Sequence, residues 1–190
     1  MRVIGGTAKR RQLRAPDIDG LRPTSDRVRE AIFDILASRG ALEETSVLDA
    51  FAGSGALGIE ALSRGAASVC FVEADRRAIA AIRSNLAATG FGTSPGVRVV
   101  RADMAEFLAG EPGTRYDLAL VDPPYSFDAW RSLLEMMRAD LAVLESSRPV
   151  ELPDSFAVCR EYRYGGTLVT LVGARTPGRD DPRTTEKDSV

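Results

Sequence analysis

The most specific chemical feature of this sequence is the segment Asp122-Pro123-Pro124-Tyr125, which directly follows an apolar, strand-like run at residues 116–121. Two prolines stiffen the backbone and remove two N–H donors, so the carbonyl oxygens remain as outward-facing acceptors. These acceptors and the Asp122 carboxylate can hold an amino group through its two N–H bonds. The ring of Tyr125 can stack on a nucleic-acid base that carries this amino group. The segment therefore predicts a reaction site for an exocyclic amine.

A glycine-rich turn lies upstream of this segment. Asp49 lies near the end of a predicted strand, and Gly53, Gly55 and Gly58 follow it where a helix is expected to begin. Glycines let a ligand approach the backbone closely, and a helix N-terminus offers free N–H donors. Glu73 ends the next predicted strand, twenty residues after Gly53, where its carboxylate can accept hydrogen bonds from both hydroxyls of a ribose. The turn therefore predicts a cofactor that contains a nucleoside.

The glycine spacing by itself leaves two cofactor classes open, because GxGxxG followed by an acidic residue also marks dinucleotide-binding folds. Two acidic positions favour S-adenosylmethionine. Asp49 can face a cationic amino-acid end, whereas it would repel a pyrophosphate. Asp103, after the third predicted strand, can accept from an adenine amino group and can also cap a helix that begins at Met104. An NAD-binding oxidoreductase that uses GSGALG stays as the alternative of a different class.

Together the two segments predict methyl transfer to a planar amino nitrogen. Such a nitrogen is a poor nucleophile because its lone pair is delocalised into the ring. If the Asp122 carboxylate and the Pro123 carbonyl accept its N–H bonds, the nitrogen can pyramidalise and direct its lone pair at a sulfonium methyl group. No strong base is required, because the proton becomes acidic only after transfer. This agrees with a sequence that contains no histidine, which excludes Ser-His-Asp, Cys-His and histidine-metal chemistry.

Positive charge is concentrated at the start of the chain. Residues 1–29 hold eight Lys or Arg against three Asp, a net charge of +5, which leaves −7 for residues 30–190 because the whole chain carries −2. A basic arm on an acidic domain indicates an anionic partner, such as the phosphate backbone of a nucleic acid.

The cysteines and the hydropathy pattern bear on the compartment. Cys70 and Cys159 are far apart in strand-like apolar runs, which predicts core packing rather than a disulfide or a metal site. No apolar run approaches the roughly 20 residues of a membrane span, and residues 1–6 lack the apolar stretch of a signal peptide. We therefore expect a cytoplasmic protein.

The elements that position these residues alternate between strand and helix. Predicted strands lie at 46–51, 68–73, 97–101 and 116–122, with helices between them at 55–64, 76–89 and 104–109. A further helix, at 128–138, precedes an apolar run at 141–144, and two β-rich runs at 156–162 and 167–172 are joined through Gly165-Gly166 as a hairpin. Continuous apolar runs at 69–72 and 118–121 suit central strands. The pattern predicts a doubly wound, mostly parallel seven-stranded Rossmann-like α/β sheet with a C-terminal antiparallel hairpin.

Three regions follow from this pattern. A basic arm at residues 1–29 runs into a first helix, for which Thr24-Ser25-Asp26 supplies N-cap candidates and Val28, Ile32 and Leu36 repeat with helical spacing. The catalytic domain is expected at residues 24–172. Residues 173–190 lack apolar periodicity and are expected to form a disordered tail.

Three blocks of the sequence resemble amino-methyltransferases with the (D/N/S)-P-P-(Y/F/W) signature, and within that group the bacterial 16S rRNA guanine-N2 methyltransferase family of the RsmD type. The blocks are MRVIGG with LRPTSDRVREAIFDIL at 21–36, DAFAGSGALGIEALSRGA at 49–66, and VDPPY at 121–125. The first block discriminates the family, since the other two recur across many methyltransferases. The resemblance is weaker after Trp130, where residues 131–140 run almost directly into the apolar run at 141–144.

The resemblance implies a class I methyltransferase that uses S-adenosyl-L-methionine to methylate N2 of one guanine in 16S rRNA, on the small subunit or its precursor. It implies a monomer with no metal and no membrane partner. The predicted cofactor site comprises Asp49, Phe51, Gly53, Ser54, Gly55, Glu73, Ala74, Asp103, Met104 and Asp122. The predicted catalytic residues are Asp122, Pro123, Pro124 and Tyr125. The residues implied to contact RNA phosphates are Arg10, Arg11, Arg14, Arg22, Arg27 and Arg29.

The nearest rival function is DNA adenine-N6 methylation, which can use the same Asp-Pro-Pro-Tyr chemistry but normally needs a separate target-recognition region. The NAD-binding oxidoreductase leaves the proline-rich segment and the basic arm unexplained. A catalytically idle RNA-binding assembly factor leaves Asp122, Gly53 and Glu73 unexplained.

Overall fold

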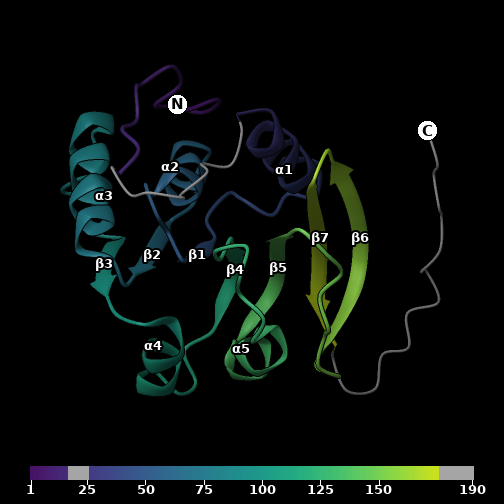
Figure 1. The fold of residues 1–190 in the computed structure, drawn as a ribbon. Helices are drawn as coiled ribbons and strands as arrows, with labels where there is room; N and C mark the ends of the chain where they lie inside the picture. Colours follow the sequence, from purple (N-terminus) through teal and green to yellow (C-terminus); the bar gives the residue numbers. More distant parts are fainter. Residues whose placement is uncertain (17–25, 176–190) are drawn as a thin grey trace.

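A seven-stranded sheet forms the centre of the computed structural model, which describes residues 1–16 and 26–175 (Figure 1). The strand order is β3-β2-β1-β4-β5-β7-β6. The strands are β1 Ser46–Ala50, β2 Ser68–Glu73, β3 Val97–Arg101, β4 Tyr116–Val121, β5 Ala139–Ser146, β6 Phe156–Tyr164 and β7 Thr167–Ala174. Strands β1 to β5 are mutually parallel, whereas β7 is antiparallel to both β5 and β6. The predicted fold is confirmed, and the strand order reverses between β1 and β4, where sheets of this kind bind their ligands.

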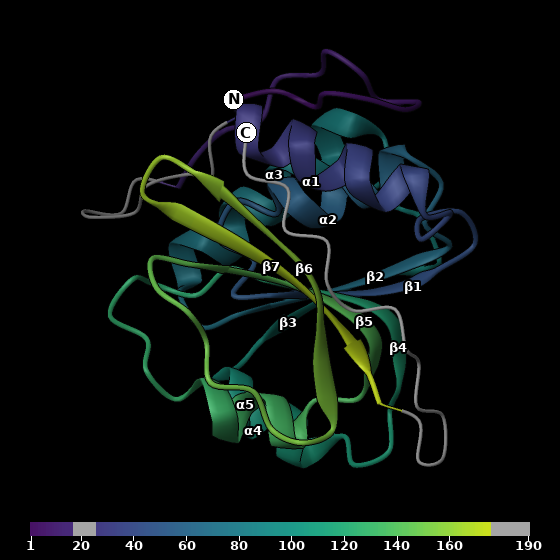
Figure 2. The same cartoon turned by 90° about the vertical axis from the view of Figure 1, so that its right-hand side faces the viewer.

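Helices cover both faces of the sheet. Figure 2 shows α1, α2 and α3 on one side of the strands, and α4 and α5 on the other. Their bounds are α1 Asp26–Ser38, α2 Ala56–Ser63, α3 Arg76–Thr89, α4 Met104–Gly110 and α5 Trp130–Met136. None of the helices in the described part of the chain is long and apolar enough to cross a membrane.

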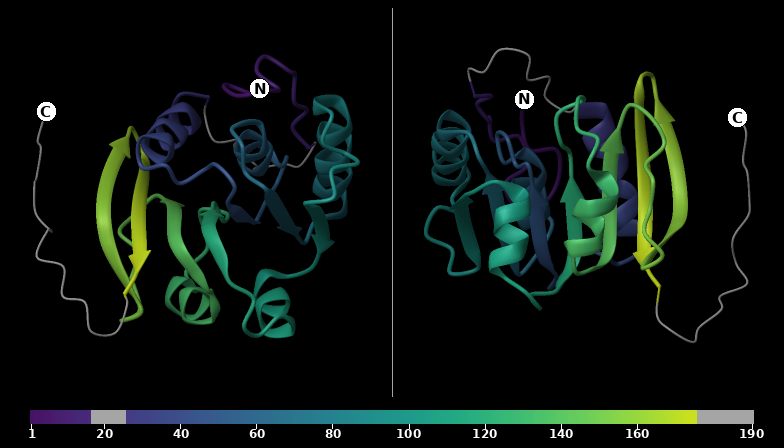
Figure 3. Two further views of the ribbon diagram at one scale, coloured as in Figure 1. Left: turned by 180° about the vertical axis from the view of Figure 1, so that it is seen from behind. Right: turned by 60° about the horizontal axis from the view of Figure 1, so that its bottom comes forward.

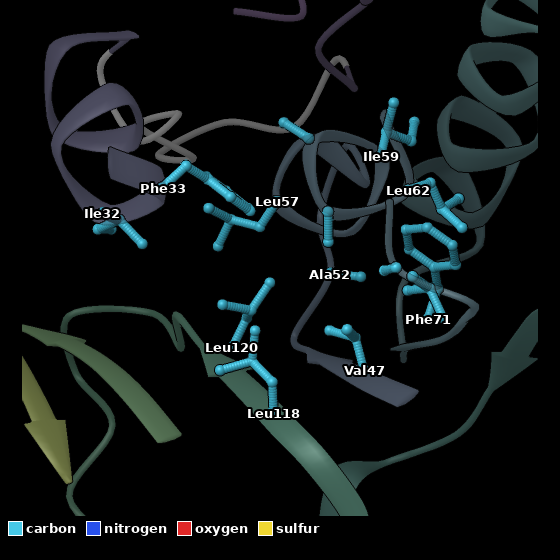
Figure 4. Packing of buried hydrophobic residues seen from close by; sticks show 14 of the residues in the cluster. Ile32, Phe33, Val47, Ala52, Leu57, Ile59, Leu62, Phe71, Leu118 and Leu120 are labelled. Atoms are coloured by element: carbon cyan, nitrogen blue, oxygen red, sulfur yellow. The ribbon is translucent and has the colours of Figure 1, made fainter. Parts of the chain in front are cut away.

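Alternation along the central strands divides the apolar side chains between two cores. In β4, Leu118 and Leu120 face the cluster under α1 and α2, while Ala119 and Val121 face the cluster under α4 and α5. Figure 4 shows the first of these clusters, where the two leucines lie opposite residues of α1 and α2. A strand that buries both faces is apolar at most of its positions, which explains the continuous runs at 69–72 and 118–121 in the sequence.

Residues 1–16 of the basic arm form a folded element that packs on the domain. Its backbone turns back on itself, with the N–H of Val3 donating to the Arg11 carbonyl (3.0 Å) and the N–H of Leu13 donating to the Met1 carbonyl (3.0 Å). The arm lies over the outer side of α2, between α1 and α3 (Figure 3). Because the arm covers α2 from outside and the sheet covers it from inside, all eight residues of α2 are buried.

The predicted boundaries of the elements between residues 46 and 174 lie within two residues of the observed ones. The helix predicted at 128–138 is shorter, Trp130–Met136, because Met137 already has an extended backbone and leads into β5. Cys70 is buried as predicted, but Cys159 is exposed, so the prediction of core packing is wrong for Cys159. It lies on β6, which pairs only with β7 in this sheet and therefore forms its edge. The disordered tail was predicted to begin at residue 173, but Gly173 and Ala174 belong to β7, so the prediction is wrong for these two residues. The N-cap candidates Thr24 and Ser25 and residues 176–190 of the predicted tail lie outside the described residues.

Candidate active site

The register of the central strands brings the two predicted reactive segments together. Ala50, the last residue of β1, pairs with Val121, the last residue of β4, and also with Val72 of β2. The glycine-rich turn and the Asp-Pro-Pro-Tyr segment therefore leave the sheet side by side, at the edge formed by the carboxyl ends of the parallel strands. Glu73 leaves β2 at the same edge.

The segment after β4 presents its aromatic residue to solvent. Pro123 is buried and Asp122 is half-buried, whereas Tyr125 is 57 % exposed, the most exposed large hydrophobic side chain in the described part of the chain. The turn is closed by the N–H of Phe127, which donates to the Pro124 carbonyl (2.8 Å). An exposed tyrosine next to a half-buried carboxylate is an arrangement that can receive a base carrying an amino group.

Three aromatic rings are in contact at the turn. The ring centroids of Phe51 and Phe127 are 5.3 Å apart, and those of Phe127 and Trp130 are 5.4 Å apart in an edge-to-face arrangement. Phe51 belongs to the glycine-rich turn, so this contact joins the predicted cofactor loop to the predicted substrate loop. Pairs of this geometry are worth about 0.5–1.5 kcal/mol beyond the area that they bury.

Two glycines of the turn are required for different reasons. Gly53 has a φ of +54°, a backbone conformation that disfavours other residues. A Cβ on Gly58 would lie 2.4 Å from the Phe71 ring and 2.8 Å from Asp49 Oδ2, so Gly58 lets α2 approach the sheet. The GxGxxG spacing therefore combines a turn requirement with a packing requirement.

Glu73 fixes the shape of the turn in addition to its predicted role toward a ribose. Its Oε2 accepts a hydrogen bond from the Gly53 N–H (2.9 Å), and its Oε1 accepts one from the Asp75 N–H (2.8 Å). The carboxylate thus ties the glycine-rich turn to the segment that enters α3. The contact to ribose hydroxyls stays a prediction.

Asp49 is a buried carboxylate with an unused oxygen. Its side chain is 1 % exposed, Oδ2 accepts the Gly58 N–H (2.8 Å), and Oδ1 has no hydrogen-bond partner within residues 1–16 and 26–175. Burial raises the pKa of Asp49 well above its usual range, the bond from Gly58 opposes that shift, and the charges of Asp122 and Glu73 raise the pKa further. Three carboxylates within electrostatic reach of one another form an environment that favours a cationic ligand group and disfavours a pyrophosphate.

Asp103 caps α4, as the sequence predicted. Its Oδ1 accepts from the Ala105 N–H (2.8 Å) and the Glu106 N–H (3.3 Å). Of the neighbouring predicted site residues, Met104 is buried and Ala74 is exposed. Contact of Asp103 with an adenine amino group stays a prediction.

The arginines that were predicted to contact RNA differ in their exposure to solvent. Arg10, Arg11, Arg14 and Arg27 are exposed, and Arg22 lies outside the described residues. Arg29 needs a correction, because its side chain is fully buried and therefore not available to a phosphate. Its Nη2 donates to the Arg2 carbonyl (2.5 Å) and to Asp26 Oδ1 (2.9 Å), so Arg29 holds the arm against α1.

Sequence reasoning missed three buried polar residues that seat the arm, namely Glu60, Ser63 and Asn85. The Glu60 carboxylate accepts the N–H groups of Ile4 and Gly5, both at 2.7 Å. The sequence does contain a signal for Glu60, because a single carboxylate interrupts the apolar sequence of α2. A carboxylate on a buried helix needs a hydrogen-bond partner. No group of three or more side chains suited to a metal ion occurs in the described residues.

The fold and the paired loops define this chain as a Rossmann-like α/β protein of the methyltransferase class. Among solved structures, the chain is similar to "Putative methyltransferase yhhF from Escherichia coli", with a TM-score of 0.79, 36 % identity, and coverage of 92 % of this chain and 97 % of that one. A Thermus structure described as hypothetical protein TTHA0928 gives a TM-score of 0.79 at 33 % identity, and covers 92 % of this chain and 99 % of that one.

The family model described as "Conserved hypothetical protein 95" matches residues 1–173, and the chain belongs to this family. The chain is 36 % identical over 191 residues to "Ribosomal RNA small subunit methyltransferase D" of Escherichia coli K12, covering 95 % of this chain and 93 % of that protein. It is also 36 % identical over 185 residues to "Putative rRNA methyltransferase YlbH" of Bacillus subtilis, covering 92 % and 100 % respectively. These matches confirm the resemblance to the RsmD-type family.

Proposed function

We propose that this protein is an S-adenosylmethionine-dependent methyltransferase that transfers a methyl group to the exocyclic N2 amine of a guanine in 16S ribosomal RNA. The observation that carries the proposal is the pairing of Ala50 with Val121, which sets the carboxylate-lined glycine turn beside the exposed Asp-Pro-Pro-Tyr segment. The names of the relatives support ribosomal RNA of the small subunit as the substrate.

The residues around the glycine turn fit S-adenosylmethionine. The unpartnered Oδ1 of Asp49 provides a buried acceptor for the ammonium group of the methionine part. Glu73 would hold the ribose hydroxyls, Asp103 the adenine amino group, and the turn Gly53-Ser54-Gly55 would line the cofactor. When bound there, the cofactor supplies an electrophilic methyl group on a sulfonium.

The segment after β4 would hold the guanine. The Asp122 carboxylate and the Pro123 carbonyl accept the two N–H bonds of the amine, which turns the nitrogen lone pair toward the donor side of the site. Tyr125 stacks on the extruded base, a contact worth about 1–3 kcal/mol that helps offset the cost of unstacking it. The protein acts mainly by orientation, so the site needs no strong base.

The exposed arginines of the arm and of α1 would contact the RNA backbone. Arg10, Arg11, Arg14 and Arg27 are exposed and can approach phosphates, whereas Arg29 instead supports the arm. We propose that the protein acts as a monomer on the small subunit or its assembly precursor. A ribosomal RNA substrate supports the cytoplasm as the compartment in which the protein acts.

The test is a labelling experiment. Small ribosomal subunits from a strain that lacks this gene are incubated with the protein and tritiated S-adenosylmethionine, and the rRNA is digested to nucleosides. The expected product is labelled N2-methylguanosine in 16S rRNA, with no label in subunits from the parent strain. Label that appears only in DNA, as N6-methyladenine, would contradict the ribosomal substrate, and preferential binding of NAD over S-adenosylhomocysteine would contradict the cofactor.

A further inference from the structure

Asn85 is a buried polar residue of α3 that touches neither the predicted base nor the predicted ribose contacts. Its side chain is 1 % exposed. Its Oδ1 accepts the Arg14 N–H (2.8 Å), and its Nδ2 donates to the Arg14 carbonyl (2.9 Å) and to the Ser54 carbonyl (2.8 Å). The reversed amide would place an acceptor against two carbonyls, so the three partners fix its orientation. One side chain therefore joins the arm to the centre of the glycine-rich turn.

The other anchors of the arm do not make this connection. Ser63 accepts the Ala8 N–H (2.9 Å) and donates to the Gly5 carbonyl (2.6 Å), so it seats the arm at the far end of α2. Glu60 likewise holds Ile4 and Gly5 along α2. Another contact joins the arm to the turn, since the Ser54 hydroxyl lies 3.5 Å from the Met1 sulfur. Sulfur is a weak acceptor, so this contact is weaker than the three hydrogen bonds of the Asn85 side chain.

Ser54 is the residue of the turn that most needs such an anchor. It lies between Gly53 and Gly55, whose φ values are +54° and +76°. Glycines on both sides leave this peptide with few intrinsic restraints on its orientation. The peptide between Ser54 and Gly55 is held on two sides, because its N–H donates to the Ala52 carbonyl (2.7 Å) and its carbonyl accepts from Asn85 Nδ2 (2.8 Å). The bond to Ala52 lies within the turn, so Asn85 is the contact that fixes the orientation of this peptide relative to α3 and the arm.

We propose that Asn85 is a positioning residue that couples the seating of the arm to the geometry of the cofactor turn. The inference rests on the proposed function, since it assumes that the turn binds S-adenosylmethionine and that the arm approaches RNA. Because the side-chain amide of Asn85 bonds to both Arg14 and Ser54, a fixed arm also fixes the conformation of the turn. Linkage then requires the reverse, so the cofactor stabilises the seated arm to the same extent. RNA that holds the arm in place thereby strengthens cofactor binding.

The first test compares S-adenosylhomocysteine affinity by calorimetry in the full chain and in two buried-residue variants of α3. Asn85→Ala should raise the dissociation constant about tenfold, because the Ser54 carbonyl and the Arg14 backbone lose their partners. Thr89→Ala is the matched control, since Thr89 lies one turn later, is buried, and bonds only to carbonyls within α3. Its affinity should stay within about twofold of the wild type.

A second pair of variants leaves Asn85 intact and guards against a folding defect. Arg14→Pro removes the N–H that Asn85 accepts, whereas Arg14→Ala loses the same charge but keeps the N–H. Without RNA present, Arg14→Pro should weaken S-adenosylhomocysteine binding several-fold and Arg14→Ala should not. Wild-type affinity in both Asn85→Ala and Arg14→Pro would overturn the coupling.

Hydrogen exchange gives a readout that a merely structural role would not change. S-adenosylhomocysteine should slow exchange of the Leu13 and Arg14 amides in the wild type and leave it unaltered in Asn85→Ala. Equal protection by the ligand in both proteins would also overturn the inference. A wild-type chain that binds no S-adenosylhomocysteine would overturn the proposed function together with the inference, so the two failures are distinguishable.

Discussion

The glycine-rich turn and the Asp-Pro-Pro-Tyr segment lie side by side, yet they differ in how far their polar groups are already engaged. In the turn, Glu73, Asn85 and Asp49 hold the backbone at Gly53, Ser54 and Gly58. After β4, by contrast, Tyr125 extends into solvent. The predicted cofactor half is held in shape by the chain's own side chains, whereas the predicted substrate half leaves its aromatic ring exposed to solvent. Changes in the first half should therefore alter ligand binding, and changes in the second should alter turnover.

The largest expected effect comes from Asp122. Asp122→Ala should lower kcat by roughly 10²–10⁴, because the amine loses the carboxylate that orients it. The affinity for S-adenosylhomocysteine should change little, and single-turnover methylation with calorimetry separates the two quantities. Asp128→Ala, which removes an exposed carboxylate further along the same loop, is the control. Equal kcat in Asp122→Ala and wild type would refute the assignment of the reaction site.

Asp49→Asn tests the glycine-rich turn as a cofactor site. An amide keeps an acceptor for the Gly58 N–H but cannot attract an ammonium group, so S-adenosylhomocysteine should bind on the order of 100-fold more weakly. The ligand-free variant should nevertheless gain a few degrees in Tm at neutral pH, because an ionisable carboxyl, whose charge is unfavourable in this buried site, is replaced by a neutral amide. A loss of both stability and affinity would show that Asp49 serves the fold rather than the ligand.

The same carboxyl predicts a pH dependence. A raised pKa means that the folded state holds this proton at pH values where the unfolded chain has released it. Stability of the ligand-free protein should therefore fall as pH rises from the usual Asp value of about 3.9 through the raised value. Urea midpoints between pH 5 and 8 should show this decline in the wild type and a smaller one in Asp49→Asn; parallel profiles would contradict the assignment to Asp49.

Tyr125→Ala should have a smaller effect, confined to the substrate. Loss of stacking should reduce kcat/KM for the ribosomal substrate about tenfold, within the range expected for one aromatic contact. Tyr125→Phe retains the ring and should retain most activity. Thermal stability should be unchanged in both, since the side chain is largely exposed. If Tyr125→Phe were as defective as Tyr125→Ala, the hydroxyl rather than the ring would be the functional group.

The smallest effects are expected from single exposed arginines of the arm. Arg10→Ala and Arg11→Ala should each weaken RNA binding several-fold and reduce the dependence of log K on log salt concentration by roughly one unit or less. Arg39→Ala makes the same charge change on an exposed residue beyond α1 and is the control. Titrations at several salt concentrations measure both effects. Equal slopes of log K against log salt concentration for the arm and control variants would contradict a contact between the arm and RNA.

Local patterns were sufficient to predict the order of strands and helices and the place of the two reactive segments. Strand β4 is apolar at both faces, and its end at residues 122–125 is marked by the two prolines. The cap at Asp103 was predictable because N-capping depends on residues two or three positions away.

The docked arm was not predictable in the same way. Its buried apolar residues, Val3, Ala8 and Leu13, follow neither a helical nor a strand period. Its partners Glu60 and Asn85 are 55 to 71 residues away along the chain. Arg29 was misassigned for the same reason, because a count of charges does not reveal that a guanidinium is enclosed by the arm and α1.

The position of the arm also has a consequence for biosynthesis. Residues 1–14 are translated before the rest of the described chain, but the side chains that receive their backbone, Glu60, Ser63 and Asn85, emerge much later. A segment that leaves the peptide tunnel before its partners is thus among the last that can reach its final place, since contacts of long sequence separation form only after the intervening chain is available. Until then α2, the helix that follows the glycine-rich turn, has an uncovered apolar face.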